Sequence, residues 1–442
     1  MLLNSKGCID EPTNLEEVGR FIRVKGWAIT AKLQKIELNV DSIPLGEIHP
    51  FINREDVKES FPHIKNSGFD QVFLMPELSE GWHKLLLKST NHNSMQVVYA
   101  RKIKYNSRVD YTPKTIGIET SRICNFQCDM CPAHSERGRY TKKDLIADDA
   151  LLDRVIPFLK SSKWPIKRVG AGAIWGEPLM NRKYFENTER IANACPGAQV
   201  VITTNGAFLN SLSIEKILDS DYIRHVAVSV DAGTKETYEL IRKGGKWDIL
   251  MENLSRLVRA KKNRKLKRPL ISSNFVAMKK NFEELPLYVK EMANIRVDAI
   301  GVVNAHNVYS SDIDQGIFDL PGKVNDVAKE REKVIKEAIS INLPKGVSLY
   351  LPSFTPEKRY PECSLNGAST ILIGIEGQVY PCCVIQSLHY EGNTEAKSMG
   401  NVFKEELEDI WSSDEFVHFR AKMLRGKAPS PICLNCPFFY GM

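Results

Sequence analysis

The chain has 442 residues, of which 43% are hydrophobic and 26% are charged, and its formal net charge is +7. This is an ordinary globular balance, and without a run of about 18 apolar residues we expect two or three soluble domains and no membrane role. The N-terminus carries no apolar signal region, so the ten cysteines predict a reducing, cytoplasmic location. The basic run at 259–268 lacks interleaved aromatic residues, so we interpret it as a solvated helix end and expect no nucleic-acid partner.

The N-terminal part, residues 1–108, has the texture of a small β-sandwich. Alternation at period two and intervening turn signals predict short strands at 21–29, 35–40, 69–75, 84–87 and 96–103. Residues 24–28, 54–57, Pro62 and 66–69 resemble an accessory β-sandwich attached to glycosyltransferases and other carbohydrate-handling proteins. The resemblance implies a possible association with carbohydrate. We expect Trp27 and Trp82 to lie in the sandwich core, with a sugar-binding platform as the alternative.

Residues 109–345 alternate between strand-like and helix-like segments. The predicted strands are 115–120, 168–173, 199–204, 225–230, 270–277 and 299–304, and the predicted helices include 151–160, 182–194, 235–241, 247–262 and 282–293. Six such repeats predict a parallel α/β sheet, which amounts to three quarters of an eight-stranded barrel. In such a barrel we expect the functional residues to follow the carboxyl ends of the strands.

Three closely spaced cysteines, Cys124, Cys128 and Cys131, directly follow the first of these strands. A cubane iron-sulfur cluster takes four thiolates, so a group of three predicts a 4Fe-4S cluster with one iron open to a non-protein ligand. Zinc is the alternative, but it would normally require a second cysteine or histidine pair at finger spacing.

The C-x3-C-x2-C spacing resembles that of the radical S-adenosylmethionine (radical SAM) enzymes, and polar motifs follow later strands in the expected order. They are Trp175-Gly176-Glu177-Pro178, Thr203-Thr204-Asn205-Gly206, Ser229-Val230-Asp231 and Ser272-Ser273-Asn274. The resemblance implies a partial (β/α)6 TIM-like barrel that binds S-adenosylmethionine. The cofactor-binding residues that it implies are Met130, Gly176, Glu177, Pro178, Asn205, Ser229, Asp231 and Asn274.

The last segment, residues 346–442, carries a second cysteine set. The pattern of this set resembles the auxiliary-cluster domains called SPASM and twitch. Its four cysteines are Cys363, Cys382, Cys433 and Cys436. That resemblance implies a second, fully ligated 4Fe-4S cluster, with structural zinc as the alternative. Cys383 is a candidate hydrogen-atom donor, although a buried or alternative-ligand role is open to it, and Cys195 and Cys8 receive no functional role.

Taken together, these resemblances imply reductive cleavage of S-adenosylmethionine to a 5'-deoxyadenosyl radical that abstracts hydrogen from a substrate. We expect oxidation of a sugar or aminocyclitol, with the second cluster as electron acceptor and a flavodoxin or ferredoxin as electron donor. The alternatives are modification of a ribosomally made peptide, epimerisation of a sugar, or a non-catalytic iron-sulfur electron carrier or carbohydrate-binding protein.

Overall fold

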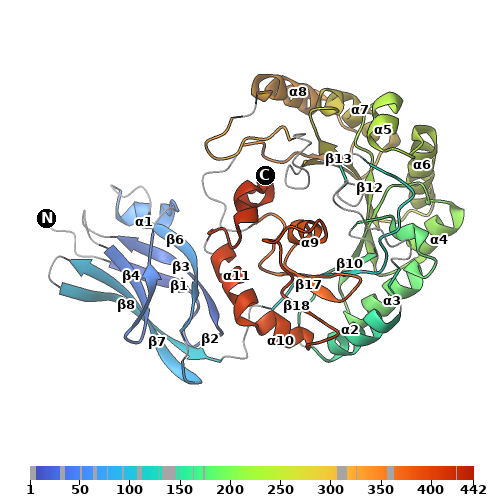
Figure 1. Ribbon diagram of the computed structural model, residues 1–442. Helices are drawn as coiled ribbons and strands as arrows, with labels where there is room; N and C mark the ends of the chain where they lie inside the picture. Colours follow the sequence, from blue (N-terminus) through green and yellow to red (C-terminus); the bar gives the residue numbers. More distant parts are fainter. Residues whose placement is uncertain are drawn as a thin grey trace. The chain divides into compact units, whose positions relative to one another are not determined.

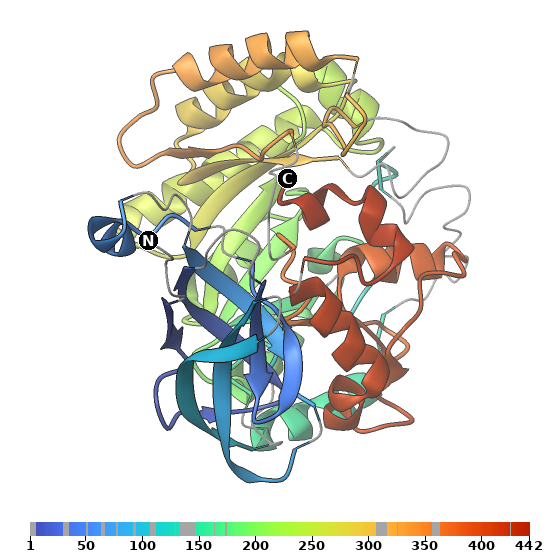
Figure 2. The same cartoon turned by 90° about the vertical axis from the view of Figure 1, so that its left-hand side faces the viewer.

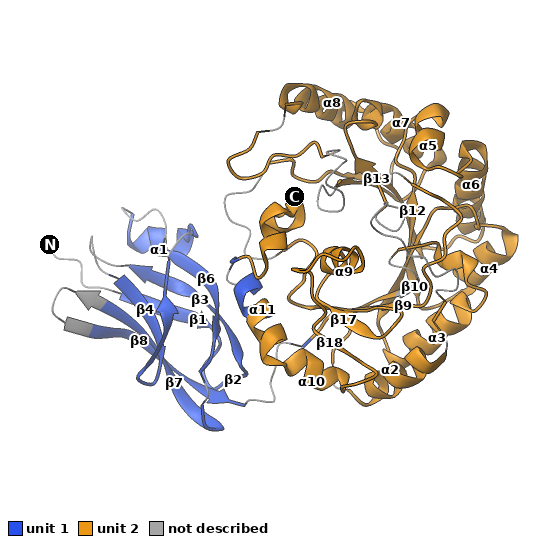
Figure 3. Cartoon of the chain, in the orientation of Figure 1, with its two compact units in different colours: residues 1–112, 420–427 blue, residues 113–419, 428–442 orange. Residues whose placement is uncertain are grey.

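The computed structural model describes residues 6–29, 35–49, 52–62, 67–76, 78–91, 94–106, 112–128, 130–131, 146–147, 149–162, 164–172, 175–305, 316–324, 326–355, 363–424 and 426–442. The chain forms two compact units, one of residues 1–112 with 420–427 and one of residues 113–419 with 428–442 (Figure 3). No helix in these described ranges is long and apolar enough to span a membrane.

The first unit is built on two sheets whose strand pairs are antiparallel, except for the parallel pair of β2 and β8 (Figure 2). One sheet has the order β1 (Lys6–Glu11), β3 (Phe21–Ile29), β6 (Gly68–Leu74), and the other has the order β2 (Glu17–Val18), β8 (Ser94–Tyr105), β7 (Gly81–Asn91), β4 (Lys35–Val40), β5 (Ile43–Glu47). A short helix, α1 (Glu55–Ser60), precedes β6. Alternate residues of the strands, such as Ile22 and Val24 on β3 and Leu85 and Leu87 on β7, share one buried core. The period-two pattern of the sequence is the physical reason for this arrangement.

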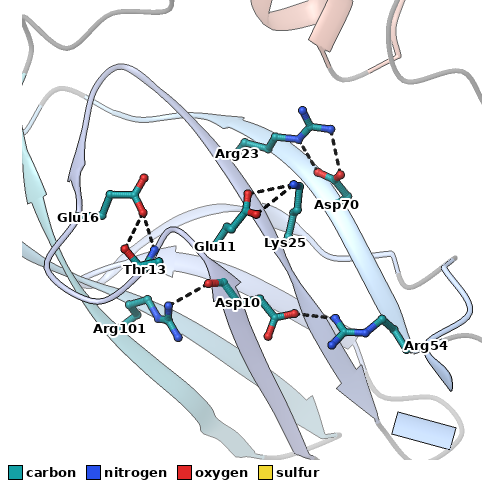
Figure 4. Close-up of polar contacts among 9 residues, drawn as sticks. All are labelled: Asp10, Glu11, Thr13, Glu16, Arg23, Lys25, Arg54, Asp70 and Arg101. Carbon is teal, nitrogen blue, oxygen red and sulfur yellow. Dashed lines mark hydrogen bonds and ion pairs between the residues drawn. The ribbon is translucent and has the colours of Figure 1, made fainter. Parts of the chain in front are cut away.

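Charged pairs occupy the opposite face of the sheet β1-β3-β6 (Figure 4). Arg23 donates two hydrogen bonds to Asp70, at 2.8 and 3.0 Å, and Lys25 donates to Glu11 at 3.1 Å. Such exposed pairs contribute only about 0.2–1 kcal/mol each. Their main consequence is that this face is solvated and belongs to no second core.

The expectation that Trp82 lies in the sandwich core is wrong. Its side chain is 51% exposed, and the Lys102 ammonium lies 4.6 Å from the centre of its ring. Trp82 lies three and five residues before the buried Leu85 and Leu87 along β7, so its side chain points to the opposite, outer face of the sheet. Trp27 is partly buried, and its ring centre lies 6.4 Å from that of Phe61.

The second unit contains one ten-stranded sheet with the order β15-β14-β13-β12-β11-β10-β9-β16-β17-β18. Its strands are β9 (Thr115–Glu119), β10 (Arg168–Gly172), β11 (Gln199–Thr204), β12 (Ile223–Ser229), β13 (Leu270–Ala277), β14 (Ala299–Asn304), β15 (Ser348–Tyr350), β16 (Thr370–Ile373), β17 (Gln378–Tyr380) and β18 (Gly400–Asn401). All neighbours from β15 to β16 are parallel. The predicted open α/β barrel is therefore confirmed, and β15 and β16 extend it beyond the six predicted strands.

Helices cover the outer side of this sheet (Figure 1). They are α2 (Asp149–Ser161), α3 (Tyr184–Ala194), α4 (Ser211–Asp219), α5 (Lys235–Ile241), α6 (Trp247–Asn263), α7 (Leu285–Ile295) and α8 (Ala328–Ser340), with the short turns η2 (Pro178–Met180) and η3 (Phe282–Glu284). The sequence predicted α2, α3 and α5 to α7 to within a few residues, with η3 and α7 merged. It did not predict α4 or α8.

The basic run at the end of α6 differs from its prediction at one residue. Lys261 is buried at 8% exposure, and its ammonium lies 2.6 Å from the Asp298 carboxylate. Asp298 also accepts a hydrogen bond from the Ile271 amide at 2.7 Å. Lys261 therefore ties α6 to the start of β13, whereas the prediction placed it in solvent.

The C-terminal segment joins the same sheet. β16 pairs with β9 in parallel, and it continues antiparallel to β17 and then to β18. The segment also contains α9 (Cys383–Tyr390), α10 (Leu407–Ser412), α11 (Asp414–Leu424), η4 (Pro431–Asn435) and η5 (Pro437–Tyr440). In Figure 1, α9 lies on the inner side of the curved sheet, opposite the ring of outer helices.

Candidate active site and cysteine clusters

The two faces of the barrel sheet differ in chemistry. On the side of the outer helices, Ile202, Val228 and Phe275 are fully buried, and Ser273 accepts a hydrogen bond from Tyr288 of α7 at 2.8 Å. Residues of the other parity form what we call the concave face. They are Thr203, His225, Ser229, Ser272, Asn274 and Val303, which parallel pairing places on the same side of neighbouring strands. The concave face also includes apolar residues such as Val201, Ala227 and Val276, and its polar residues Thr203, Ser229 and Asn274 are exposed or partly exposed.

The loop after β9 that carries Cys124, Cys128 and Cys131 is fixed by main-chain hydrogen bonds. The Gln127 amide donates to the Lys243 carbonyl at 2.8 Å, and the Cys131 amide donates to the Cys128 carbonyl at 3.0 Å. This cysteine loop, residues 123–131, follows β9 directly because the chain leaves the carboxyl end of the strand. It thus lies at the edge where a parallel barrel places its functional groups.

The motif after β10 contacts the cysteine loop closely. The Glu177 amide donates a hydrogen bond to the Ile123 carbonyl at 2.8 Å, and a Cβ atom added at Gly176 would lie 2.8 Å from that carbonyl oxygen. Gly176 also has φ +148°, in the region that favours glycine. Glycine is therefore required here both by backbone conformation and by the close approach of the loop.

The Glu177 side chain is fully buried and organises the motif after β11. It accepts hydrogen bonds from the Thr204 hydroxyl and the Asn205 amide, both at 2.7 Å, and from the Leu179 amide at 3.1 Å. Burial raises the pKa of Glu177, while these hydrogen bonds lower it. Asn205 in turn donates to Asn125 of the cysteine loop at 2.9 Å. The predicted residues Gly176, Glu177 and Asn205 are thus assembled around the loop of the first cysteine set.

Asp231, predicted to contact S-adenosylmethionine, is buried and bound by protein groups. Its carboxylate accepts hydrogen bonds from the Arg242 side chain at 2.6 Å and from the Val276 amide at 2.7 Å, and the residue is only 1% exposed. Both carboxylate oxygens accept hydrogen bonds from protein groups, and contact of Asp231 with a cosubstrate hydroxyl stays a prediction. Ser229, two residues earlier on the concave face, keeps that role as a prediction.

Asn274, Met130 and Pro178 are also brought to the carboxyl edge of the sheet. Asn274 is paired in register with Ser229 and shares the concave face with it. Met130 packs against a small buried cluster of Ile241, Met278 and Ala305. Pro178 begins the η2 turn after Glu177. Their contacts with S-adenosylmethionine stay predictions.

The second set of cysteines is gathered from three separate segments. Cys363 precedes β16, Cys382 caps α9, and Cys433 and Cys436 lie at the C-terminal η4 turn. The Ser364 amide donates to the Phe438 carbonyl at 2.9 Å, which ties the first segment to the last. Burial raises the pKa of every thiol in the set, to about 11 for Cys433, and neighbouring thiols raise the pKa of Cys382, Cys433 and Cys436 further. The fold therefore places these four thiols within electrostatic reach of one another, and their ligation of one cluster stays a prediction.

The remaining cysteines lie elsewhere. All ten cysteines belong to the described residues, and none of them forms a disulfide. Cys383 is partly buried in the first turn of α9, next to Cys382. Cys195 ends α3, and burial raises its pKa to about 11, while Cys8 lies on β1 of the sandwich.

A buried ion pair that the sequence did not predict links the two cysteine sets. The Arg122 guanidinium donates to Glu119 at 2.8 Å and lies 3.8 Å from the centre of the Tyr390 ring. Glu119 also accepts hydrogen bonds from the Gln386 side chain at 3.3 Å and from the Ile375 amide at 3.2 Å. Burial raises the pKa of Glu119, and Arg122 lowers it. These contacts fix α9, which begins beside Cys382, to the strand that leads into the cysteine loop.

Both cysteine sets offer the donor chemistry of iron-sulfur clusters. Thiolates are the usual protein ligands of such clusters, and the second set offers four thiols, of which Cys363, Cys433 and Cys436 are buried and Cys382 is partly buried. Among the described residues there is no group of three or more His, Cys, Asp or Glu side chains close enough to hold a single metal ion. The assignment of clusters therefore rests on the donor sets and on the family comparisons.

Comparison with known proteins identifies the two domains. The model of the radical SAM superfamily matches residues 118–292, and the model of the SPASM iron-sulfur cluster-binding domain matches residues 363–437. The tungsten-containing aldehyde ferredoxin oxidoreductase cofactor-modifying protein of Pyrococcus furiosus is 23% identical over 73% of this chain and 87% of its own length. A probable GTP 3',8-cyclase of Saccharolobus islandicus is 24% identical over 60% of this chain and 82% of its own length.

Among solved structures, Streptococcus suis SuiB bound to the precursor peptide SuiA shares the fold, with a TM-score of 0.53 and 15% identity over 75% of this chain and 71% of that one. The open parallel barrel and its cysteine loop define a cluster-dependent enzyme. The chain is a radical SAM enzyme with a C-terminal SPASM domain, which confirms the resemblance found in the sequence. Its cofactors are accordingly iron-sulfur clusters in both domains and S-adenosylmethionine.

Proposed function

We propose that this enzyme oxidises a polyhydroxylated small molecule, a sugar or an aminocyclitol, at a C–H bond. When bound, the first cluster and S-adenosylmethionine would supply the chemistry of hydrogen-atom abstraction, and the second cluster would supply an acceptor for the electron that remains once a proton has left to solvent. Cys124, Cys128 and Cys131 would hold the first cluster, and Cys363, Cys382, Cys433 and Cys436 would hold the second.

The buried contacts between α9 and the end of β9 carry this proposal. Glu119 lies on the concave side of β9. It is two residues from Gly117 and therefore faces the same side, and Gly117 pairs in register with Gly170 of β10, which pairs with Val201 of β11. Val201 in turn pairs with His225 of the concave face. Gln386 of α9 donates to its carboxylate at 3.3 Å. Since α9 begins beside Cys382, the auxiliary site is joined to the strand that precedes the first cysteine set. Such an arrangement suits an acceptor beside the reacting substrate.

The choice of substrate is supported by the open part of the concave face. Thr203, Ser229 and Asn274 present hydroxyl and amide groups there. These groups donate and accept hydrogen bonds, as the vicinal hydroxyls of a sugar do. A peptide is the second candidate, because the SuiB structure that shares this fold contains a precursor peptide.

Isotope transfer tests this proposal. The anaerobically reconstituted chain would be incubated with S-adenosylmethionine and either carbon-deuterated sugars and aminocyclitols or deuterated peptides, and 5'-deoxyadenosine would be analysed by mass spectrometry. We expect deuterium from a sugar or aminocyclitol in 5'-deoxyadenosine, together with a ketone product. Transfer only from peptides would replace the proposed substrate, and a product with an inverted stereocentre would indicate an epimerase.

The matched control is Cys128→Ala, which removes one ligand of the first set. We expect at least about a 100-fold loss of 5'-deoxyadenosine, in line with the loss of a metal ligand or of the group that orients it. Undiminished formation of 5'-deoxyadenosine in this variant would contradict the assigned cluster site.

A further inference from the structure

The loop after α5 contains a buried arginine that contacts the first cysteine set. Arg242 donates from Nε to the Asp231 carboxylate at 2.6 Å, and its Nη2 pairs with the same oxygen. Its Nη1 is directed at the Cys128 sulfur, 3.8 Å away, within reach of a long hydrogen bond to sulfur. The arginine side chain is 10% exposed and that of Asp231 is 1% exposed. One guanidinium therefore connects a fixed carboxylate to a ligand thiol.

Asp231 is itself held by two neighbouring elements. Its second carboxylate oxygen accepts a hydrogen bond from the Val276 amide of β13 at 2.7 Å. Its carbonyl accepts from the Asn281 side chain at 2.8 Å, and Asn281 also donates to the Val276 carbonyl at 2.9 Å. Asp231 has φ +61°, an uncommon conformation for a residue other than glycine. Such a conformation persists only where the surroundings hold it, and these bonds do so.

We infer that Arg242 is a positioning residue that donates a hydrogen bond to the Cys128 thiolate and thereby raises the reduction potential of the first cluster. Hydrogen bonds to ligand sulfurs withdraw electron density from an iron-sulfur cluster and favour its reduced state. Asp231 holds the guanidinium in place, as outer groups commonly orient metal ligands. The inference rests on the radical SAM assignment and not on the proposed substrate.

The orientation of the Arg242 N–H group matters more for the Cys128 thiolate than the net charge of the Arg242–Asp231 pair. The Arg242–Asp231 pair is formally neutral, so its effect on the thiolate comes from the oriented N–H group. A lysine at 242 keeps the positive charge but lacks the planar fork that contacts two partners at once. The chain also offers a matched control in the buried Arg331. This side chain donates to the Asp319 carboxylate at 2.9 Å and to the Ile317 carbonyl at 2.6 Å, and neither partner is a cysteine.

The test is a potentiometric titration of the reconstituted full-length chain without substrate, followed by electron paramagnetic resonance. The first cluster is recognised by the change in its signal when S-adenosylmethionine is added. We expect Arg242→Gln to shift the midpoint potential of this cluster to lower values and Arg242→Lys to shift it less. Asp231→Asn should shift it in the same direction, while Arg331→Gln leaves it unchanged.

An unchanged midpoint potential in Arg242→Gln, with full iron content and a native circular dichroism spectrum, would overturn the inference. If that variant does not fold or load iron, unchanged potentials in both Arg242→Lys and Asp231→Asn would overturn it instead. An equal shift in Arg331→Gln would also overturn it, because the effect would then be a general consequence of breaking a buried pair. If the midpoint potential shifts as expected but the enzyme oxidises no sugar, only the proposed substrate would be wrong, and the role of Arg242 would stand.

Discussion

Buried charged side chains in the second unit are paired through specific geometry. Glu119 with Arg122 and Asp231 with Arg242 each combine an ion pair with further hydrogen bonds from neighbouring elements. Removing one member of such a pair leaves an uncompensated buried charge, which typically costs about 3–5 kcal/mol. These residues therefore fix the positions of the loops that carry them.

His225 gives the barrel a defined pH dependence. It lies on the concave face with Nε2 2.7 Å from the Ser272 hydroxyl, and burial lowers its pKa, as does the Arg168 charge to a lesser extent. The unfolded chain then binds more protons than the folded chain below about pH 6.5, so stability falls as pH falls. We expect a contribution of up to about 1.4 kcal/mol per pH unit, because one proton is involved.

Urea unfolding at pH 7.5 and pH 5.5 measures this contribution. In His225→Gln, which keeps a hydrogen-bonding side chain but does not titrate, the loss of unfolding free energy between the two pH values should be smaller than in the native chain. An identical loss in both proteins would contradict the assigned role of His225.

At the scale of an element, the contact between the turn after β10 and the cysteine loop depends on one glycine. A Cβ at Gly176 would lie 2.8 Å from the Ile123 carbonyl oxygen and 2.9 Å from the Arg122 carbonyl carbon. These two neighbours are backbone atoms, which cannot move aside as easily as the end of a flexible side chain can. We expect Gly176→Ala to displace the cysteine loop and to lower both the unfolding free energy and the iron content.

Gly197→Ala is the matched control, since Gly197 has φ +82° but no heavy atom within 4 Å of an added Cβ. Both variants carry the strain of a positive φ, about 1–3 kcal/mol. Overpacking should add at least about 1 kcal/mol in Gly176→Ala alone. Equal unfolding free energies in the two variants would mean that the cysteine loop moves aside without loss of stability, which would contradict the expected overpacking at Gly176.

The elements also show what a sequence can reveal. The strands β11, β13 and β14 were predicted to the residue because buried parallel strands have apolar runs bounded by polar residues. The motifs at Glu177 and Asn205 followed from their place at the strand ends. The orientation of Asp231 could not be predicted, because its partner Arg242 lies eleven residues later in a different loop and nothing in the local pattern joins them.

The buried ion pair of Glu119 and Arg122 was not predicted for a similar reason. Their burial depends on α9, which lies more than 250 residues further along the chain, as the 267-residue separation of Glu119 and Gln386 shows. Trp82 was misassigned because hydrophobic character alone does not decide which face of a strand a side chain occupies. The odd spacing between Trp82 and the buried Leu85 and Leu87 of the same strand settles that question.

For the whole molecule, the ten-stranded sheet makes the auxiliary segment part of the barrel. In the double variant Cys363→Ala and Cys433→Ala, we expect about half of the iron to be lost, because only the first cluster retains its ligands. Formation of 5'-deoxyadenosine should remain measurable, while oxidised product falls at least about tenfold if the second cluster accepts the electron.

Iron analysis and product quantification on the same preparation check this expectation. The matched control is Cys8→Ala, which removes a cysteine of the sandwich and should leave both quantities unchanged. Full iron content in the double variant would contradict the assignment of the second cysteine set. Undiminished substrate oxidation despite lost iron would contradict its role as an acceptor.

The participation of residues 420–427 in the first unit has a consequence for biosynthesis. Arg420, which is fully buried, lies with its guanidinium carbon 5.6 Å from the centre of the Phe21 ring. At roughly 5–20 residues per second, the ribosome needs about 15–60 s after residue 112 to reach this segment. The first unit can therefore be completed only after residues 420–427 are translated, and Cys433 and Cys436 follow them within a few residues. Completion of the first unit and closure of the auxiliary cysteine set thus become possible at nearly the same point of synthesis.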